Sequence, residues 1–258
     1  MFVQPLSPNY FDKGSVAERY AQGRPYLHPQ IIQRIRQFVD PVDYVLDVAC
    51  GTGMSSVALL DIADRIVGID LSREMLAQAS RHPRINYVAG EAEALPVGDG
   101  SVGLVSVALA YHWLDRRRFL AEARRALRDG GWLIVYNTWF TGDMEENAAF
   151  GEWWSQEYLV RYPTPRRRSQ LIAEHDASAA GFQLLDHSMV DIPVRFSLSE
   201  LRIYLTTQSN VIAAVEKGES LESVRDWLNK SLSTQFHAER PTFRFCGEVW
   251  MFRSSRSA

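Results

Sequence analysis

The chain has 258 residues, of which 46% are hydrophobic and 23% are charged. This length and composition exclude wholesale disorder and favour one large domain with a substantial core. Lys and Arg number 28 against 31 Asp and Glu, which gives a net charge of -3. Nucleic-acid-binding proteins usually carry a basic excess for phosphate contacts, so we expect no nucleic-acid partner.

The sequence has no pattern typical of a membrane span, a secretory signal or a metal site. Its longest apolar stretch, residues 102–110, is too short to cross a bilayer. The first residues lack the basic and apolar regions of a secretory signal. Cys50 and Cys246 form neither a metal-binding spacing nor a disulfide framework. We therefore expect a cytoplasmic protein with no membrane partner and no metal. The oligomeric state stays open.

The first predicted element is an amphipathic helix within residues 1–40. Its apolar residues fall on one face of a helical period, at Ile31, Ile32, Ile35, Phe38 and Val39. We expect residues 1–40 to form an N-terminal helical cover.

Residues 41–138 alternate between strand and helix patterns. The predicted strands are residues 44–48, 66–70, 85–88, 104–108 and 132–136. The predicted helices are residues 56–61, residues 73–80 behind the N-cap Ser72, and a helix that ends at Gly130 with Phe119, Leu120, Ala123, Ala126 and Leu127 on one face. Such alternation predicts an α/β fold with a Rossmann-like, doubly wound and mostly parallel sheet, covered by helices on both faces.

The pattern loosens after Thr138. Aromatic residues crowd the stretch that follows, a helix is expected over residues 169–180, and strands over 183–194 and 243–251 complete a seven-stranded sheet. Helices are expected over 199–215 and 219–235. We interpret residues 139–168 and 198–240 as helical insertions on the substrate side of a single domain, 1–258, whose cofactor-binding core is 41–138. The aromatic residues suit either a lid over a substrate or the core of the added helices.

A glycine loop and two acidic residues point to a nucleoside cofactor. Gly51 and Gly53 follow the first strand and allow a tight turn against a ligand. Asp70 ends the second strand, where a carboxylate can accept hydrogen bonds from both hydroxyls of a ribose. Ligands of open α/β sheets bind at this carboxyl edge of the strands.

Two features favour S-adenosylmethionine over NAD. The dinucleotide fingerprint has a third glycine where this chain has Ser56. Asp47 stands just before the loop, where a buried carboxylate is awkward beside a pyrophosphate but suits a cationic amino-acid group.

With these motifs the core resembles the class I S-adenosylmethionine-dependent methyltransferases. Residues 46–53 resemble the first motif of that family, residues 68–72 its second, and residues 90–96 the segment that lines the adenine. The resemblance implies S-adenosyl-L-methionine as cofactor. It implies the following cofactor-binding residues, with Glu93 as the alternative to Glu91: Asp47, Ala49, Gly51, Gly53, Asp70, Leu71, Met75, Glu91, Ala92 and Ala108.

A narrower resemblance, to trans-aconitate methyltransferase-like proteins, involves both ends of the chain. It is carried by Phe11, residues 17–20 and 24–26, the pair His112-Trp113, and residues 247–253. Members of that group methylate carboxylates or hydroxyls of small metabolites. The resemblance therefore implies a small-molecule substrate and O-methylation.

His112 follows the fourth strand, at the edge where the methyl group should emerge, so it is the candidate catalytic residue, as a base or as a donor that orients the acceptor. A purely structural role for His112 is the alternative. The candidate substrate-binding residues are Tyr20, Arg24, Trp113 and Trp139. Arg24 could pair with a carboxylate or anchor the N-terminal segment. Methylation of RNA or protein, or cofactor binding without methyl transfer, remain the rival functions.

Overall fold

The computed structural model describes residue 11, residues 13–165 and residues 172–255, and the chain divides into two compact units. The core unit consists of Tyr26–Thr138, Arg167–Val190 and Gly247–Ala258. The insertion unit consists of Met1–Pro25, Trp139–Arg166 and Asp191–Cys246. The expected N-terminal cover, 1–40, is thus shared between the two units, and both expected insertions lie mainly in the insertion unit.

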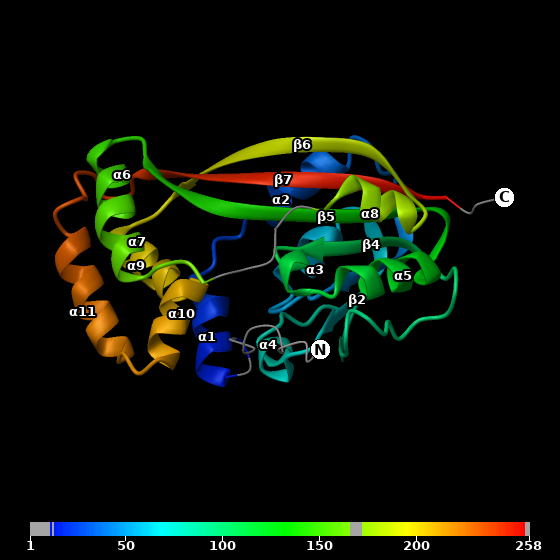
Figure 1. Ribbon diagram of the computed structural model, residues 1–258, viewed down its shortest axis with the longest axis horizontal. Helices are drawn as coiled ribbons and strands as arrows, with labels where there is room; N and C mark the ends of the chain where they lie inside the picture. Colours follow the sequence, from blue (N-terminus) through cyan, green and yellow to red (C-terminus); the bar gives the residue numbers. More distant parts are fainter. Residues whose placement is uncertain (1–10, 12, 166–171, 256–258) are drawn as a thin grey trace. The chain divides into compact units, whose positions relative to one another are not determined.

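Seven strands form one sheet in the order β3-β2-β1-β4-β5-β7-β6 (Figure 1). Their bounds are β1 Val42–Val48, β2 Ala63–Asp70, β3 Ile85–Ala89, β4 Val102–Ala108, β5 Leu127–Met144, β6 Phe182–Arg195 and β7 Thr242–Ser254. The ladders from β3 to β5 are parallel, whereas the edge formed by β7 and β6 makes the sheet mixed. The predicted Rossmann-like, mostly parallel sheet is confirmed.

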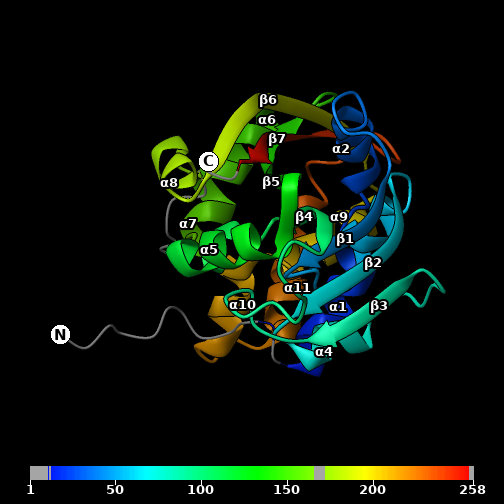
Figure 2. The same cartoon turned by 90° about the vertical axis from the view of Figure 1, so that its right-hand side faces the viewer.

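Helices cover both faces of the sheet within the core unit, as Figure 2 shows for α2 on one side and α5 with α8 on the other. The helices are α2 His28–Ile35, α3 Met54–Leu59, α4 Arg73–Ala77, α5 Arg116–Ala126 and α8 Glu174–Ala179, with a short 3-10 helix η1 over Tyr111–Trp113. The apolar face of α5 is buried with the inner residues of β4 in one cluster. Burial of this face holds α5 in place, because apolar area removed from water stabilises at about 25 cal/mol per Å².

The four helices predicted within residues 1–138 all end earlier than expected, and those expected over 56–61 and 73–80 end at Leu59 and Ala77. The first ends at Ile35, and Phe38 is 39% exposed, packed beneath the Arg34 guanidinium instead of on the apolar face. Pro41 disfavours helical backbone at Asp40, so the chain leaves the helix before it. The helix that was expected to stop at Gly130 ends at Ala126, because β5 begins at Leu127.

The insertion unit is built from helices around an aromatic core. Its elements are α1 Gly14–Gly23, α6 Ala149–Trp153, a π-helical turn η2 Trp154–Tyr158, α7 Leu159–Arg161, α9 Leu198–Thr206, α10 Ser209–Glu216 and α11 Leu221–Leu232. Its buried aromatic side chains include Phe140, Phe150, Trp153, Tyr158, Tyr162, Phe196, Tyr204, Phe243 and Phe245. The structure therefore places most of the aromatic stretch in a packed core, which favours the second of the two interpretations.

The helix expected over residues 199–215 is two helices, with a break after Thr206. The hydroxyls of Thr206 and Thr207 donate to the carbonyls of Ile203 and Tyr204 within the last turn of α9. Such local side-chain bonds compete with the helical ladder. For the helix expected over 169–180, the structure describes α8 from Glu174; residues 166–171 lie outside the described residues.

Close packing of β7 in the core unit requires a glycine at position 247. A Cβ there would lie 2.5 Å from the carbonyl oxygen of Asn137 and 2.8 Å from Cγ2 of Thr138. We expect Gly247→Ala to lower the free energy of unfolding by about 1–3 kcal/mol, as overpacking does. Gly98→Ala is the matched control, because a Cβ there meets no described atom within 4 Å. Urea unfolding of both variants checks this, and equal stabilities would contradict it.

Candidate cofactor site and active site

The strand order reverses between β1 and β4, which is where open α/β sheets bind ligands. Two non-glycine residues of the described chain have a positive φ, and they directly follow these strands. Ala49 follows β1 with a φ of 56°, and Leu109 follows β4 with a φ of 58°. Left-handed backbone costs energy in residues with a Cβ and clusters at functional sites. The carboxyl edge of β1 and β4 is therefore the candidate site.

The loop after β1 is attached to the end of β2 through Asp70. The N–H of Gly51 donates to Oδ2 of Asp70 at 2.7 Å, and the N–H of Ser72 donates to Oδ1 at 2.8 Å. Gly51 and Gly53 both have a positive φ, of 54° and 74°. The predicted residues Ala49, Gly51 and Gly53 thus lie in one loop at the candidate site, and Asp70 bonds this loop from the end of β2.

Asp47 is a fully buried carboxylate beneath this loop. Its Oδ2 accepts hydrogen bonds from the hydroxyls of Ser55 and Ser56 on α3, both at 2.6 Å. Its Oδ1 has no hydrogen-bond partner among the described residues. Burial raises the pKa of Asp47 to about 6, against the opposing effect of the two serine hydrogen bonds, and the nearby charge of Asp70 adds to the rise. The site therefore holds an acceptor suited to a cation.

Asp47 lies in a row of polar residues across four strands. In the parallel register Tyr87 stands beside Gly68, Gly68 beside Asp47, and Asp47 beside Ser106, so their side chains share one face of the sheet. The Tyr87 ring lies over Gly68, where a Cβ would come within 2.7 Å of it. The hydroxyls of Tyr87 and Ser106 are buried and, within the described chain, unpaired. The sequence reasoning missed Ser55, Tyr87 and Ser106 as neighbours of Asp47, although Ser55 and Ser56 directly follow the glycine loop.

Two predicted cofactor residues lie on the segment after β2. Leu71 is 63% exposed, and Met75 is buried on α4. Ser72 caps this helix as predicted, because its hydroxyl oxygen accepts from the N–H of Met75 at 3.2 Å. Ala108, the last residue of β4, is buried immediately before the strained Leu109.

The segment after β3 separates the two candidates for the adenine contact. Oε1 of Glu93 accepts from the N–H of Asp115 at 2.7 Å, which gives Glu93 a structural role. Glu91 is exposed and Ala92 is buried. This arrangement favours Glu91 as the residue for the adenine.

His112 and Trp113 lie together in η1, three residues after the left-handed Leu109. His112 is buried, and its ring centroid is 4.7 Å from that of Trp113. The N–H of Leu109 donates to the carbonyl of Tyr136 on β5 at 2.9 Å, which fixes the start of this turn to the sheet. The structure thus places the predicted catalytic histidine at the carboxyl end of β4.

The other predicted substrate-binding residues, Tyr20, Arg24 and Trp139, lie in the insertion unit. The Arg24 guanidinium is 4.6 Å from the Tyr20 ring centroid and 5.5 Å from that of Tyr204. It also donates to the carbonyl of Thr207 at 2.9 Å. Arg24 therefore anchors α1 to the end of α9. Trp139 is 36% exposed on β5.

A second buried polar pair in the core unit escaped the sequence reasoning. Nδ1 of His28 on α2 and the hydroxyl of Tyr136 on β5 share a hydrogen bond of 2.8 Å. Burial lowers the pKa of His28 to about 4, so its ring is neutral at physiological pH. No spacing or motif connects residues 28 and 136, so the sequence offered no signal for the pair.

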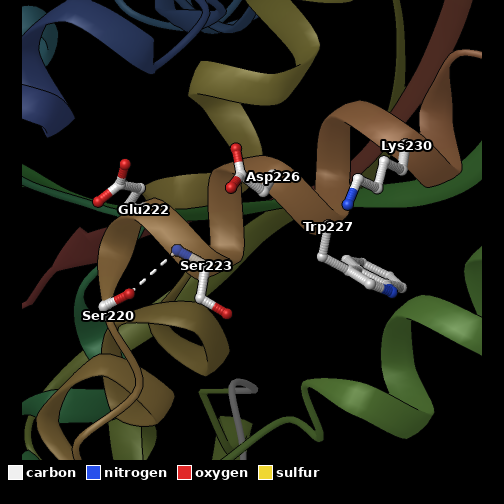
Figure 3. A pocket seen from close by; sticks show the side chains of 6 residues that line it. All are labelled: Ser220, Glu222, Ser223, Asp226, Trp227 and Lys230. Carbon is white, nitrogen blue, oxygen red and sulfur yellow. Dashed lines mark hydrogen bonds between the residues drawn. The ribbon is translucent and has the colours of Figure 1, made fainter.

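A surface hollow of about 480 Å³ lies along α11 in the insertion unit (Figure 3). It is lined by Ser220, Glu222, Ser223, Asp226, Trp227 and Lys230, all from this helix and its N-cap. None of these residues is a predicted site residue. The hollow is open and mostly polar, and its lining includes neither a glycine loop nor the carboxyl end of a strand.

Residues 11, 13–165 and 172–255 contain no group of three or more His, Cys, Asp or Glu side chains arranged to hold a metal ion. Within the same ranges, no helix combines the length and apolar character needed to span a bilayer.

Comparison with known proteins identifies the core. Residues 46–135 match the family described as a methyltransferase domain. A protein of Dictyostelium discoideum that is named as a methyltransferase is 23% identical over 89% of this chain and 90% of its own length. The malonyl-[acyl-carrier protein] O-methyltransferase of Hamiltonella defensa is 35% identical, over 41% of each chain.

Solved structures of methyltransferases are also similar to this chain. One from Anaeromyxobacter dehalogenans, described as a type II methyltransferase, has a TM-score of 0.67 and 25% identity, over 90% of this chain and 97% of that one. Phosphoethanolamine N-methyltransferase 2 of Haemonchus contortus, solved with S-adenosylhomocysteine, shares the fold at a TM-score of 0.56 and 17% identity, over 96% of this chain and 60% of that one. These similarities indicate that the protein is an S-adenosylmethionine-dependent methyltransferase, and its cofactor is S-adenosyl-L-methionine.

The described residues fit this cofactor. The Oδ1 of Asp47, which has no partner among the described residues, suits the cationic amino group of the cofactor. A pyrophosphate would instead place negative charge beside a buried carboxylate. The individual roles of the cofactor-binding residues stay predictions.

We predict that Asp47→Asn stabilises the protein without ligand and weakens cofactor binding. Because the pKa of Asp47 is raised in the folded state, its contribution to stability falls as the pH rises from about 4 to about 6 and stays low above that. The variant should gain about 1–3 kcal/mol of unfolding free energy at pH 8 and much less near pH 4.5. Urea unfolding at both pH values and calorimetry with S-adenosylhomocysteine check the two effects. A variant that is less stable at pH 8 would contradict the first.

We predict the opposite pH dependence for His28. Because its pKa is lowered in the folded state, its contribution to stability is lost as the pH falls from about 6.5 to about 4, by up to about 3 kcal/mol. His28→Asn should remove this part of the acid sensitivity. Urea unfolding between pH 4 and 7.5 checks it, with His175→Asn, at an exposed position, as the control. Identical pH profiles for wild type and His28→Asn would count against it.

Proposed function

We propose that this methyltransferase transfers the methyl group of S-adenosylmethionine to an oxygen of a small molecule, either a carboxylate or a hydroxyl. The observation that carries the proposal is the buried His112, with the ring of the partly buried Trp113 beside it, in the turn after β4, next to the strand that bears the glycine loop. A histidine at that edge can accept a proton from a hydroxyl or donate a hydrogen bond to a carboxylate.

Methyl transfer from this cofactor requires the protein mainly to position the acceptor. When bound, the cofactor supplies a methyl group activated by its sulfonium. The chain has to hold the acceptor oxygen in line with that carbon and exclude water. We assign the positioning of the acceptor oxygen to His112. We assign the exclusion of water to the apolar ring of Trp113. Tyr20 and Trp139 remain proposed further contacts of the substrate, whereas the guanidinium of Arg24, the third candidate, anchors α1 to α9.

Two observations support an oxygen acceptor. The chain resembles trans-aconitate methyltransferase-like proteins in its opening residues, in His112-Trp113 and in its closing strand. The relative from Hamiltonella defensa is named malonyl-[acyl-carrier protein] O-methyltransferase. A carboxylate needs no base at neutral pH, whereas an alcohol benefits from one, so the role of His112 differs between the two acceptors.

The rival functions have less support. The net charge of -3 provides no basic excess for RNA, and we propose a cytoplasmic enzyme that acts on a free metabolite without nucleic acid or membrane. Cofactor binding without methyl transfer is tested directly by looking for product.

We predict that the purified protein, given S-adenosylmethionine with a labelled methyl group, methylates members of a panel of small carboxylic acids and phenols. Mass spectrometry detects the product, and mild base returns an ester to the acid but leaves an ether intact. His112→Asn should lower turnover of the best acceptor roughly 10²-fold or more for a hydroxyl and much less for a carboxylate.

Calorimetry with S-adenosylhomocysteine provides the control for this prediction. We expect His112→Asn to bind it with unchanged affinity, and His175→Asn to leave both binding and turnover unchanged. Wild-type turnover of a hydroxyl acceptor by His112→Asn would reduce His112 to a packing role. Label found only on nitrogen or carbon would refute O-methylation.

A further inference from the structure

Three hydrogen bonds connect Asp70 and Ser72 to the glycine loop and to α4. Gly51 N–H and Ser72 N–H donate to the two carboxylate oxygens of Asp70, and the Ser72 hydroxyl oxygen accepts from the N–H of Met75. The Met75 side chain also packs close to the loop, because its Cε lies 3.1 Å from the position that a Cβ on Gly51 would occupy. The side chains of Asp70 and Ser72 thus connect the glycine loop, the end of β2 and α4.

We propose that Asp70 is a positioning residue that assembles the cofactor loop before the cofactor arrives, a role separate from its expected contact with the ribose. The inference concerns the cofactor loop alone and does not depend on which acceptor is methylated.

The backbone geometry explains why the loop needs such a restraint. Ala49, Gly51 and Gly53 alternate in left-handed conformation over five residues, and for Ala49 this conformation is costly. An N–H bonded to an ionised carboxylate is among the stronger hydrogen bonds of proteins. The bond from Gly51 N–H therefore holds a backbone segment that has little intrinsic preference for its shape.

The same carboxylate can still serve the ribose. An ionised carboxylate offers about four acceptor positions, so two amide donors and two ribose hydroxyls are compatible with one side chain. A loop that is already in its bound shape binds without the cost of ordering, which is the usual origin of affinity from pre-organisation.

The first test measures amide hydrogen exchange in the protein without ligand. We expect Asp70→Ala to accelerate exchange at the amides of Gly51 and Ser72 by about tenfold, the loss of one charged hydrogen bond. Asp64→Ala, at an exposed position on the same strand, is the matched control and should leave both amides unchanged. Unchanged exchange at Gly51 in Asp70→Ala overturns the proposal.

Asp70→Asn keeps the proposal testable if Asp70→Ala does not fold. Its side chain retains one carbonyl oxygen and replaces the other by an amide donor, so one of the two N–H groups loses the oxygen atom that it bonds in the wild type. We expect faster exchange at either Gly51 or Ser72, and protection of both as in wild type overturns the proposal.

The second test is a thermodynamic cycle, measured by calorimetry, that combines one protein substitution with one change in the ligand. The ligands are S-adenosylhomocysteine and its analogue without the ribose 2′- and 3′-hydroxyls. We expect Asp70→Ala to weaken the first at least tenfold and the analogue at least about threefold, because the loop is lost for both ligands. If Asp70 acted through the ribose alone, wild type and Asp70→Ala would bind the analogue equally, and this result overturns the proposal. A wild-type protein that methylates no acceptor refutes the proposed function but leaves both tests intact.

Discussion

The carboxylate of Asp70 is the constraint on which the arrangement of the site depends. It accepts from the backbone of the glycine loop on one side and from the N-cap of α4 on the other. The reversal of strand order between β1 and β4 sets the place of the site, but strand order alone does not shape the glycine loop there. Three left-handed residues in the loop have to be held by something outside it. The bond from Asp70 joins this strained segment to the stable end of a central strand.

Asp47, beneath the glycine loop, destabilises the fold, whereas Asp70 holds the loop in place. Asp47 is fully buried, with one oxygen satisfied by two serines and the other without a partner in the described chain. Such a carboxylate costs stability when it ionises, and a cationic ligand recovers that cost. Proteins commonly accept local instability at a site in return for function. The raised pKa of Asp47 and the lowered pKa of His28 are two consequences of the same burial in the core unit.

The insertion unit shows how burial decides between interpretations that a sequence leaves open. Aromatic residues after Thr138 are compatible with a lid or with a core, because both are rich in large apolar side chains. In the structure most of them pack against one another, and Trp154 stacks on Tyr158 at a centroid distance of 4.5 Å. The sequence suggested Arg24 as a partner for a substrate carboxylate. In the structure its guanidinium contacts two tyrosine rings and donates a hydrogen bond to a backbone carbonyl of this unit.

The sequence by itself determined the elements of the core and the class of cofactor. These features are local patterns: the strand and helix periodicities, the glycine loop, and the acids Asp47 and Asp70. Each can be recognised within a short stretch of sequence, without the tertiary structure. What joins distant residues was decided by the tertiary structure: the row of Tyr87, Asp47 and Ser106, and the bond between His28 and Tyr136. Helix ends were also decided there, because Leu127 joins β5 and Arg24 takes the carbonyl of Thr207. Strand register and burial bring these groups together, and neither can be read from spacing along the chain.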